Sequence, residues 1–404
     1  MKYDFETVLD RYDNGSVKWN LMKKKKPQVG RGVVPFSIAD MEFKNPPEII
    51  EALKEYLDTA VLGYQTAEPS WYEAVTGWTK RRYGWETRPE WFYTTPGVVN
   101  ALYHGVLAFT ESEDGVIVMP PVYYPFYKAV ETNGRRTVRC PLKEGKDLSY
   151  TIDFDRLEAL ASDPKNTLLI LCNPHNPVGR VWTRQELLMV SQICLRHHVF
   201  VISDEIHCDL IMPGHTFTSF ASLSEENAAN TMTCIAPSKT FNLAGLEASC
   251  VILPDRERRH QLKAEMSRVS YEGRVNALGY KAMEAAYTRC DQWLSQAIQA
   301  IHSNHRLLTE FLKEHCPDVK AAPLEGTYLQ WLDLRALGWT PKEQESIMEE
   351  ADLFFDEGGM FGPEGEGFER MNLACPQTVI LDGLGRFSQV VNRRKRGGGD
   401  DHRG

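Results

Sequence analysis

Lys239 is the residue of this sequence whose type and position most directly suggest chemistry. It lies in PSKTFNLAGL, directly after the apolar run Met232–Ala236. Burial beside such a run disfavours the charged form of a lysine and lowers its pKa, and the neutral amine can then attack an aldehyde carbon. A lysine that merely extends to solvent would fit the same position, so Lys239 alone does not decide between the two.

Two further polar residues follow apolar runs in the same way. Asp204 comes after Val199–Ser203, and Asn176 lies in NPHNPVG after Leu168–Cys172. Pyridoxal 5′-phosphate (PLP) requires a carboxylate against its pyridine nitrogen, because the protonated ring is the electron sink that stabilises a carbanion. Asp204 is the candidate for that contact, and the Asn176 amide can donate a hydrogen bond to the cofactor's phenolic oxygen. Taken alone, NPHNPVG predicts only a turn.

A phosphate site and an aromatic pair complete the set of candidates. The sequence TPGVVNALYHG places Gly97 at the start of a predicted helix, Val98–Phe109, where free backbone N–H groups and the helix dipole favour a phosphate. One glycine does not define a phosphate site, and neither a dinucleotide fingerprint nor a P-loop is present. After the run Val116–Met119, Tyr123 offers a ring to stack on a pyridine and Tyr124 a nearby phenol, although aromatic pairs are usually part of a core.

These candidates share one edge of the sheet that the sequence predicts. Apolar runs and amphipathic helical patterns alternate between residues 90 and 255. This alternation predicts an α/β fold with a mainly parallel sheet covered on both faces. Ligands of such sheets bind outside the carboxyl ends of the strands, where the polar residues lie. The predicted strands are Val116–Met119, Leu168–Cys172, Val199–Ser203, Met232–Ala236 and Ser249–Leu253, and the predicted helices between them are Val98–Phe109, Tyr124–Asn133 and Arg184–His197.

The pattern changes at both ends of this central part. Pro46 and Pro47 precede a predicted helix, Glu48–Leu57, and beyond residue 256 a long helix, Asp291–Glu314, is followed by a strand-like run, Thr327–Leu334. We expect an N-terminal arm over 1–45 that belongs to the small domain, a large cofactor-binding domain over 46–290 and a smaller α+β domain over 291–396. The tail GGGDDHRG, 397–404, has no pattern and is expected to be disordered.

Six segments, taken in order, resemble those of fold type I PLP enzymes, the class I/II aminotransferase superfamily, along nearly the whole chain. More narrowly, they are similar to the MalY/PatB group of carbon–sulfur β-lyases, which includes the cystathionine β-lyase and cystalysin types. The resemblance implies a large domain with a mainly parallel seven-stranded sheet between helices, and a smaller α+β C-terminal domain. The segments are TPGVV, NPHNPVGRVW, SDEIH, PSKTFNLAGL, EGTYLQWLDLR and GPEGEGFERMNLACP.

The resemblance also implies a role for each matching residue. Lys239 matches the Schiff-base lysine and Asp204 the partner of the pyridine nitrogen. Arg370, in FERMNLACP, matches the arginine that binds the substrate α-carboxylate, for which a planar two-pronged donor is suited. Tyr64, in LGYQT, resembles a tyrosine that reaches the phosphate of the neighbouring subunit, so a homodimer with shared active sites is implied. The other matches are Asn176, Tyr123 and His207 beside the cofactor ring, Gly97, Val98, Val99 and Ser238 at the phosphate, and Asn176, Tyr124 and Ala39 at the substrate.

Three positions depart from the aminotransferase pattern. His207 stands where many aminotransferases have a tyrosine, three residues after the aspartate, as it does in the β-lyase group. Glu247 stands where they carry an arginine, eight residues after the lysine, so the phosphate must be neutralised by other groups. SIADMEF keeps the Ala-Asp-Met core of a family motif but has Ser37 or Ile38 in place of its usual tryptophan, so the resemblance does not define the substrate entrance of this chain.

The activity that the resemblance implies is PLP-dependent α,β-elimination, which converts L-cystathionine, L-cysteine or a related S-conjugate to pyruvate, ammonia and a thiol. Lys239 would remove the α-proton, and Tyr123 or Tyr64 would pass a proton to the departing sulfur. The alternative is an aminotransferase that passes the amino group to a 2-oxo acid with the same residues; the subgroup motifs and His207 favour the lyase. A PLP-sensing transcription factor would need a DNA-binding domain, and the fold's own segments begin near residue 30.

The composition of the chain narrows the classes of partner that it can be expected to bind. Acidic residues outnumber basic ones by 55 to 46, and the net charge of −9 provides no footprint for nucleic acid. The basic clusters Lys23–Lys26 and Arg393–Arg396 are expected to be solvated surface. The nine cysteines show no C-x-x-C pair and no zinc spacing, so we expect reduced thiols, no metal site and a cytoplasmic location. Without an apolar signal segment or membrane-spanning run, the expected partner is a small sulfur amino acid, not a membrane.

Overall fold

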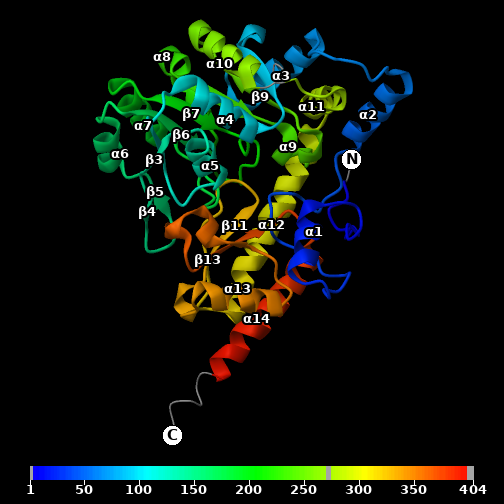
Figure 1. The fold of residues 1–404 in the computed structure, drawn as a ribbon. Coiled ribbons are helices and arrows are strands. Elements are labelled where there is room, and N and C mark those ends of the chain that lie inside the picture. Colours follow the sequence, from blue (N-terminus) through cyan, green and yellow to red (C-terminus); the bar gives the residue numbers. More distant parts are fainter. Residues whose placement is uncertain (1–2, 270–273, 398–404) are drawn as a thin grey trace.

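The computed structural model describes residues 3–269 and 274–397. A seven-stranded sheet lies between layers of helices, and a smaller antiparallel sheet with its own helices lies below it (Figure 1). The long helix α12 (Asp291–His315) extends from the large sheet's layer of helices alongside the small sheet. Both parts of the predicted α/β fold, the sheet between helices and the smaller α+β part, are confirmed.

The large sheet is mainly parallel. Its order is β1-β9-β8-β7-β6-β2-β3, and β9 runs antiparallel to both of its neighbours while the other pairs are parallel. Because β9 opposes both β1 and β8, these two strands point the same way and their carboxyl ends meet at one edge. The strands are β1 (Phe92–Thr95), β2 (Gly115–Val118), β3 (Arg136–Arg139), β6 (Asn166–Cys172), β7 (Phe200–Asp204), β8 (Thr231–Ile235) and β9 (Ser249–Ile252).

Alternate residues of the central strands point to opposite faces, and each face has its own core. On β6, Leu168 and Ile170 pack with α4 (Val98–Phe109) and α10 (Arg256–Val269), whereas Leu169 and Leu171 pack on the other side. Both faces are therefore buried, which explains why the five predicted strands are continuous apolar runs. The other helices of this part are α5 (Pro125–Glu131), α6 (Phe154–Ala161), α7 (Arg184–Arg196), α8 (Glu225–Ala229), α9 (Pro237–Thr240) and α11 (Ala277–Arg289).

The small sheet has the order β10-β11-β13-β12 and is antiparallel throughout. The predicted strand at 327–334 is β11, and the predicted helix at 291–314 is α12, each with small shifts at its ends. The FERMNLACP motif begins on β13. The elements are β10 (Lys320–Ala321), β11 (Leu329–Asp333), β12 (Asp356–Glu357), β13 (Phe368–Asn372), α13 (Pro341–Glu350) and α14 (Gln377–Gly397). A separate ribbon of β4 (Lys143–Glu144) and β5 (Tyr150–Thr151) lies at the edge of the large part.

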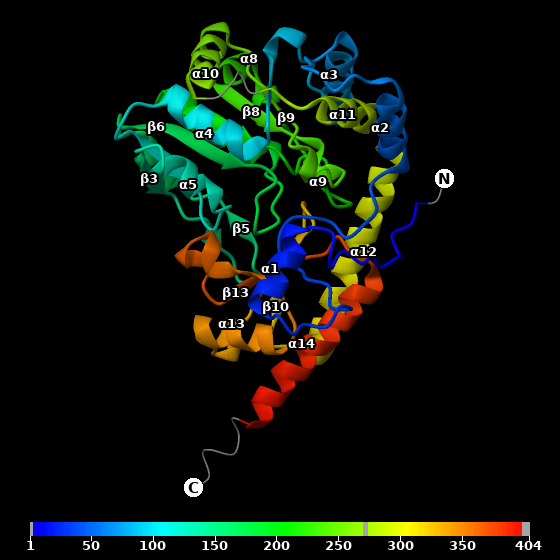
Figure 2. The same cartoon turned by 45° about the vertical axis from the view of Figure 1, so that its right-hand side comes forward.

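The N-terminal residues contact both parts. Helix α1 (Val17–Lys25) lies beside the small sheet and α13 (Figure 2), whereas α2 (Pro47–Thr59) and α3 (Pro69–Tyr83) pack against α11. Both α2 and α3 have a proline at the first position, where its missing N–H costs no hydrogen bond. The boundaries predicted at residues 46 and 291 stay predictions. Of the predicted tail, Gly397 ends α14 and the rest lies outside the described residues.

Candidate active site

The carboxyl ends of β6, β7 and β8 lie level with one another. Cys172 on β6 pairs with Asp204 on β7, and Asp204 pairs with Cys234 on β8. Asp204, the last residue of β7, therefore lies at the same edge as the segments after β6 and β8, which carry Asn176 and Lys239. Lys239 also lines a cleft of about 1190 Å³, whose other walls come from the N-terminal residues and from residues 242–247.

Lys239 lies in the short helix α9 directly after β8. Its Nζ donates a hydrogen bond to the Ala39 carbonyl oxygen at 2.8 Å. Burial lowers the pKa of Lys239 to about 8, although the negative charges of Asp40 and Asp204 act in the opposite direction. A substantial fraction of this amine is thus neutral near physiological pH, as nucleophilic attack requires.

Asp204 is the last residue of β7 and is buried. Burial raises the pKa of its carboxyl to about 7, against the opposing effects of the Ile206 N–H, which donates to Oδ1 at 3.1 Å, and of the Lys239 charge. A raised pKa means that the groups around the carboxyl stabilise its negative charge less well than water does. A cationic N–H placed against Asp204 would supply the missing partner.

Arg370 joins the two sheets at this edge. It comes from β13 of the small sheet, and its Nη1 donates to Oδ1 of Asn176, in the loop after β6, at 2.8 Å. Its Nη2 donates to Oδ2 of Asp356 at 2.5 Å, and the ring of Phe361 lies 4.7 Å from its Cζ. The guanidinium is 3% exposed, and within the part of the chain that the structure describes its Nε has no hydrogen-bond partner. One buried nitrogen is left for a further acceptor.

His207 and the two tyrosines lie among buried aromatic rings. The His207 ring meets Tyr328 edge-on at 5.9 Å, and its Nδ1 has no hydrogen-bond partner among the described residues. Burial lowers the pKa of His207 well below the ordinary value, so the imidazole is neutral. The rings of Tyr123 and Tyr124 lie 5.4 Å apart, and burial raises the pKa of Tyr123, so that its phenol keeps its proton.

The predicted phosphate residues lie at the start of α4 and in α9. Gly97 is the N-cap of α4, no side chain caps that helix, and a Cβ on Gly97 would meet nothing within 4 Å. Its φ of 95° lies in the region that favours glycine. Val98 and Val99 begin the helix, so their N–H groups have no carbonyl of the same helix to bind. Because β1 and β8 point the same way, this helix start leaves the same edge as Ser238.

One predicted site residue lies away from the chain's own site. Tyr64, between α2 and α3, is 93% exposed, and it is not brought to Lys239 of the same chain. Glu247 is exposed and has a φ of 46° at the end of a short 3-10 helix beside the cleft.

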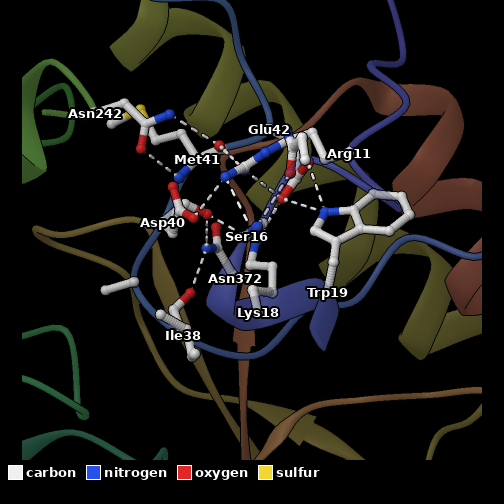
Figure 3. A network of polar contacts seen from close by, with 12 residues as sticks. Arg11, Ser16, Lys18, Trp19, Ile38, Asp40, Met41, Glu42, Asn242 and Asn372 are labelled. Carbon is white, nitrogen blue, oxygen red and sulfur yellow. Dashed lines mark hydrogen bonds and ion pairs between the residues drawn. The ribbon is translucent and has the colours of Figure 1, made fainter. Parts of the chain in front are cut away.

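A network of polar contacts holds the segment Ile38–Glu42 (Figure 3). The Ala39 carbonyl oxygen in this segment is the one that accepts the hydrogen bond from Lys239. The Asn242 side chain makes two hydrogen bonds with the backbone of Met41, at 2.9 and 3.0 Å. The Asn372 side chain donates to the carbonyl oxygens of Ile38 and Asp40, at 2.8 and 2.9 Å. The segment is thus held from the large part, three residues after Lys239, and from the small sheet, two residues after Arg370.

The other side of this network is charged and buried. Glu42 accepts hydrogen bonds from Lys18 and Arg11, each at 3.0 Å, and from the Trp19 ring nitrogen at 3.3 Å. Lys18 is 1% exposed, and its Nζ also donates to the Asp40 carbonyl at 2.7 Å. The two cations and the carboxylates of Asp40 and Glu42 balance in charge, which is what makes their burial tolerable.

Comparison with known proteins identifies the family of this chain. The family model described as aminotransferase class I and II matches residues 31–384. This chain belongs to the aminotransferase class I and II family. The resemblance inferred from six sequence segments is therefore confirmed.

Relatives within this aminotransferase family are similar over nearly their whole length. The chain is 44% identical to cystathionine beta-lyase PatB of Bacillus subtilis, over 96% of this chain and all of that one. It superposes on the PLP-containing crystal structure of cystalysin from Treponema denticola with a TM-score of 0.96 at 45% identity, covering 98% of this chain and all of that chain. The PLP-bound C-S lyase of Staphylococcus hominis gives a TM-score of 0.89 at 30% identity, covering 97% and 98%.

The residues at the sheet edge fit the cofactor of such family members. The raised pKa of Asp204, the unpartnered Nδ1 of His207 and the uncapped start of α4 at Gly97 are three separate features that a bound PLP would satisfy. In a bound PLP these features would face the ring nitrogen, a ring substituent and the phosphate, respectively. Lys239 lies at the same edge with an amine of lowered pKa.

Sequence reasoning missed one residue that contacts Arg370 in this aminotransferase-type site. Asp356, which pairs with Arg370, lies on a two-residue strand whose only signal is an acidic residue after the apolar run Leu353–Phe355.

The basic cluster at 23–26, predicted as solvated surface, is partly in ion pairs: Lys25 binds Glu345 and Glu357, and Lys26 binds Asp352. Lys25 is still 47% exposed, as the prediction of solvated surface has it, whereas Lys26 is only 18% exposed and departs from that prediction.

Proposed function

We propose that this protein is a PLP-dependent carbon–sulfur β-lyase. It converts L-cystathionine, L-cysteine or a related S-conjugate to pyruvate, ammonia and a thiol. The observation that carries this assignment is the similarity of 44 to 45% identity, over the full length of both, to one protein named a cystathionine β-lyase and another named cystalysin. The residues at the sheet edge alone would equally serve transamination, so the likeness along the whole chain decides between the two.

The cofactor is PLP. Lys239 would hold it through its amine, Asp204 would face the pyridine nitrogen, and Asn176 would face the phenolic oxygen. Tyr123 would stack on the ring, His207 would lie beside it, and the start of α4 from Gly97 to Val99, with Ser238, would hold the phosphate. Bound there, PLP supplies an electron sink for the negative charge that develops on the substrate α-carbon.

The chain's own residues bind the substrate and move its protons. Arg370 holds the α-carboxylate, with its unpartnered Nε and a geometry fixed by Asn176. Lys239, with a pKa of about 8, takes the α-proton. Tyr123 keeps its phenolic proton because burial raises its pKa, so it has a proton to give to the departing sulfur. Tyr124 and Ala39 line the substrate's position.

We also propose a homodimer with shared active sites. The segment before α3 exposes three large side chains close together, Val61, Leu62 and Tyr64, with Leu57 at the end of α2. An exposed apolar patch of this kind is typical of an interface. Tyr64 of the partner subunit would then reach the phosphate and assist proton transfer to sulfur, which is why it lies away from Lys239 of its own chain.

A cytoplasmic location accompanies this function. All nine cysteines are buried and none forms a disulfide in the part of the chain that the structure describes. Buried thiols are retained where the compartment is reducing. As a separate finding, none of the described helices has the length and apolar character needed to cross a bilayer.

Product analysis tests the lyase assignment. Purified, PLP-loaded protein is given L-cystathionine or L-cysteine, and pyruvate, ammonia and thiol are quantified with and without 2-oxoglutarate. We expect the three products in equal amounts with no requirement for the oxo acid. Glutamate that forms only with 2-oxoglutarate, with no thiol released, would identify an aminotransferase instead.

A further inference from the structure

The charge of Arg370 is already compensated before any substrate arrives. Asp356 Oδ2 accepts from Arg370 Nη2 at 2.5 Å and from the backbone N–H of Ile38 at 2.8 Å. Asp356 is 9% exposed, and β12 pairs it directly with Arg370 across the strands. The carboxylate is therefore a fixed part of the carboxylate-binding site and not a mobile surface group.

The surrounding charges leave no surplus of positive charge for a second carboxylate. Arg370, Lys239 and Lys18 are the cations whose charges act on the buried groups at this edge, and Asp356, Asp204 and Asp40 are the anions, so the cations do not outnumber the anions. An incoming carboxylate must thus share Arg370 with Asp356 at low local dielectric, where like charges repel strongly.

An amino acid and a 2-oxo acid differ in this respect. The amino acid is a zwitterion that brings its own ammonium, so its net charge is zero. A 2-oxo acid, or any carboxylic acid without the amino group, adds an uncompensated negative charge beside Asp356. The geometry therefore predicts discrimination that depends on the amino group and not on the shape of the pocket.

We propose that Asp356 is a specificity-determining residue that selects zwitterionic amino acids over carboxylates lacking an amino group. The proposal rests on the proposed function, in which Arg370 binds the substrate carboxylate.

The test compares two ligands with the same carbon skeleton, L-alanine and propanoate. Neither carries a leaving group at the β-carbon, so binding is measured without elimination, by calorimetry and by the cofactor's absorbance. The variants are Asp356→Asn, which keeps the shape and removes the charge, and Asp356→Glu, which restores the charge. Asp333→Asn is the matched control: it is also 9% exposed, lies on β11 of the same sheet and pairs with an arginine, Arg335.

We expect Asp356→Asn to tighten propanoate binding at least tenfold while the Kd for L-alanine changes less than threefold. Asp356→Glu should return propanoate to the wild-type affinity, and Asp333→Asn should change neither ligand. Equal changes for the two ligands, or no change for propanoate, would overturn the proposal. Because no turnover is measured, failure of the lyase assignment leaves this result intact; failure of Arg370 to bind carboxylates would instead abolish the response of both ligands to Arg370→Ala.

Discussion

Glu42 offers the sharpest test of how the buried charges near Lys239 are held. Glu42→Gln removes the carboxylate that accepts from Lys18, Arg11 and Trp19, and leaves a lysine that is 1% exposed without its anion. Breaking a buried ion pair from one side typically costs about 3–5 kcal/mol. Arg11 keeps Asp40 at 2.9 Å and Lys18 keeps the Asp40 carbonyl at 2.7 Å. We therefore expect Glu42→Gln to lower the free energy of unfolding by about 3 kcal/mol, the lower end of that range.

The measurement is urea unfolding of the holoenzyme, followed by tryptophan fluorescence, because Trp19 itself is part of the network. Glu345→Gln is the control: Glu345 pairs with Lys25 at 3.2 Å with both side chains 47% exposed, and such pairs contribute about 0–1 kcal/mol. The double variant Lys18→Met/Glu42→Gln removes the orphaned charge, so it should be more stable than Glu42→Gln alone. A double variant whose loss equals the sum of the two single losses would refute the reasoning.

Three further predictions concern the amine of Lys239 and the carboxylate-binding side chain of Arg370. Lys239→Ala should reduce turnover at least a thousandfold and abolish the cofactor's lysine-bound absorbance band; a variant that keeps the band would place the cofactor on another lysine. In the cofactor-free protein, the rate of reductive methylation of Lys239, followed by mass spectrometry, should rise with pH through a midpoint near 8, because the neutral amine is the reactive form; a midpoint near the ordinary value of 10.5 would contradict the burial effect. Arg370→Lys should raise the KM of the amino acid at least tenfold and lower kcat less, since a point charge replaces a two-pronged donor; an unchanged KM would remove Arg370 from the substrate.

The strand-end residues were accessible from the sequence because apolar runs mark the buried strands. Lys239, Asp204 and Asn176 each follow such a run, and the parallel sheet then brings them to one edge. Strands β1 and β3 were not located, because FYTT and RTVR are short and half polar at the sheet's two edges. The periodicity of such edge strands is too short to distinguish them from loops.

Arg370 and Asp356 are two residues whose place in the site could not be predicted from local sequence patterns. Arg370 was predicted only through the family resemblance, because nothing in a five-residue strand of a second sheet indicates that it will face the first. Asp356 was missed altogether. Lys18 and Glu42 were missed because their burial depends on contacts between residues 24 apart in an otherwise polar arm.

The double hold on the segment Ile38–Glu42 constrains how this enzyme can be recombined. Asn242 ties the segment to the lysine's own stretch of chain, and Asn372 ties it to the arginine's strand. Consider a chimera that takes its C-terminal part from one homologue and its central part from another. The two parts must then fit each other, and the segment Ile38–Glu42 must fit both of them. In such a chimera, residues 1–45 from either parent meet one asparagine of their own parent and one of the other.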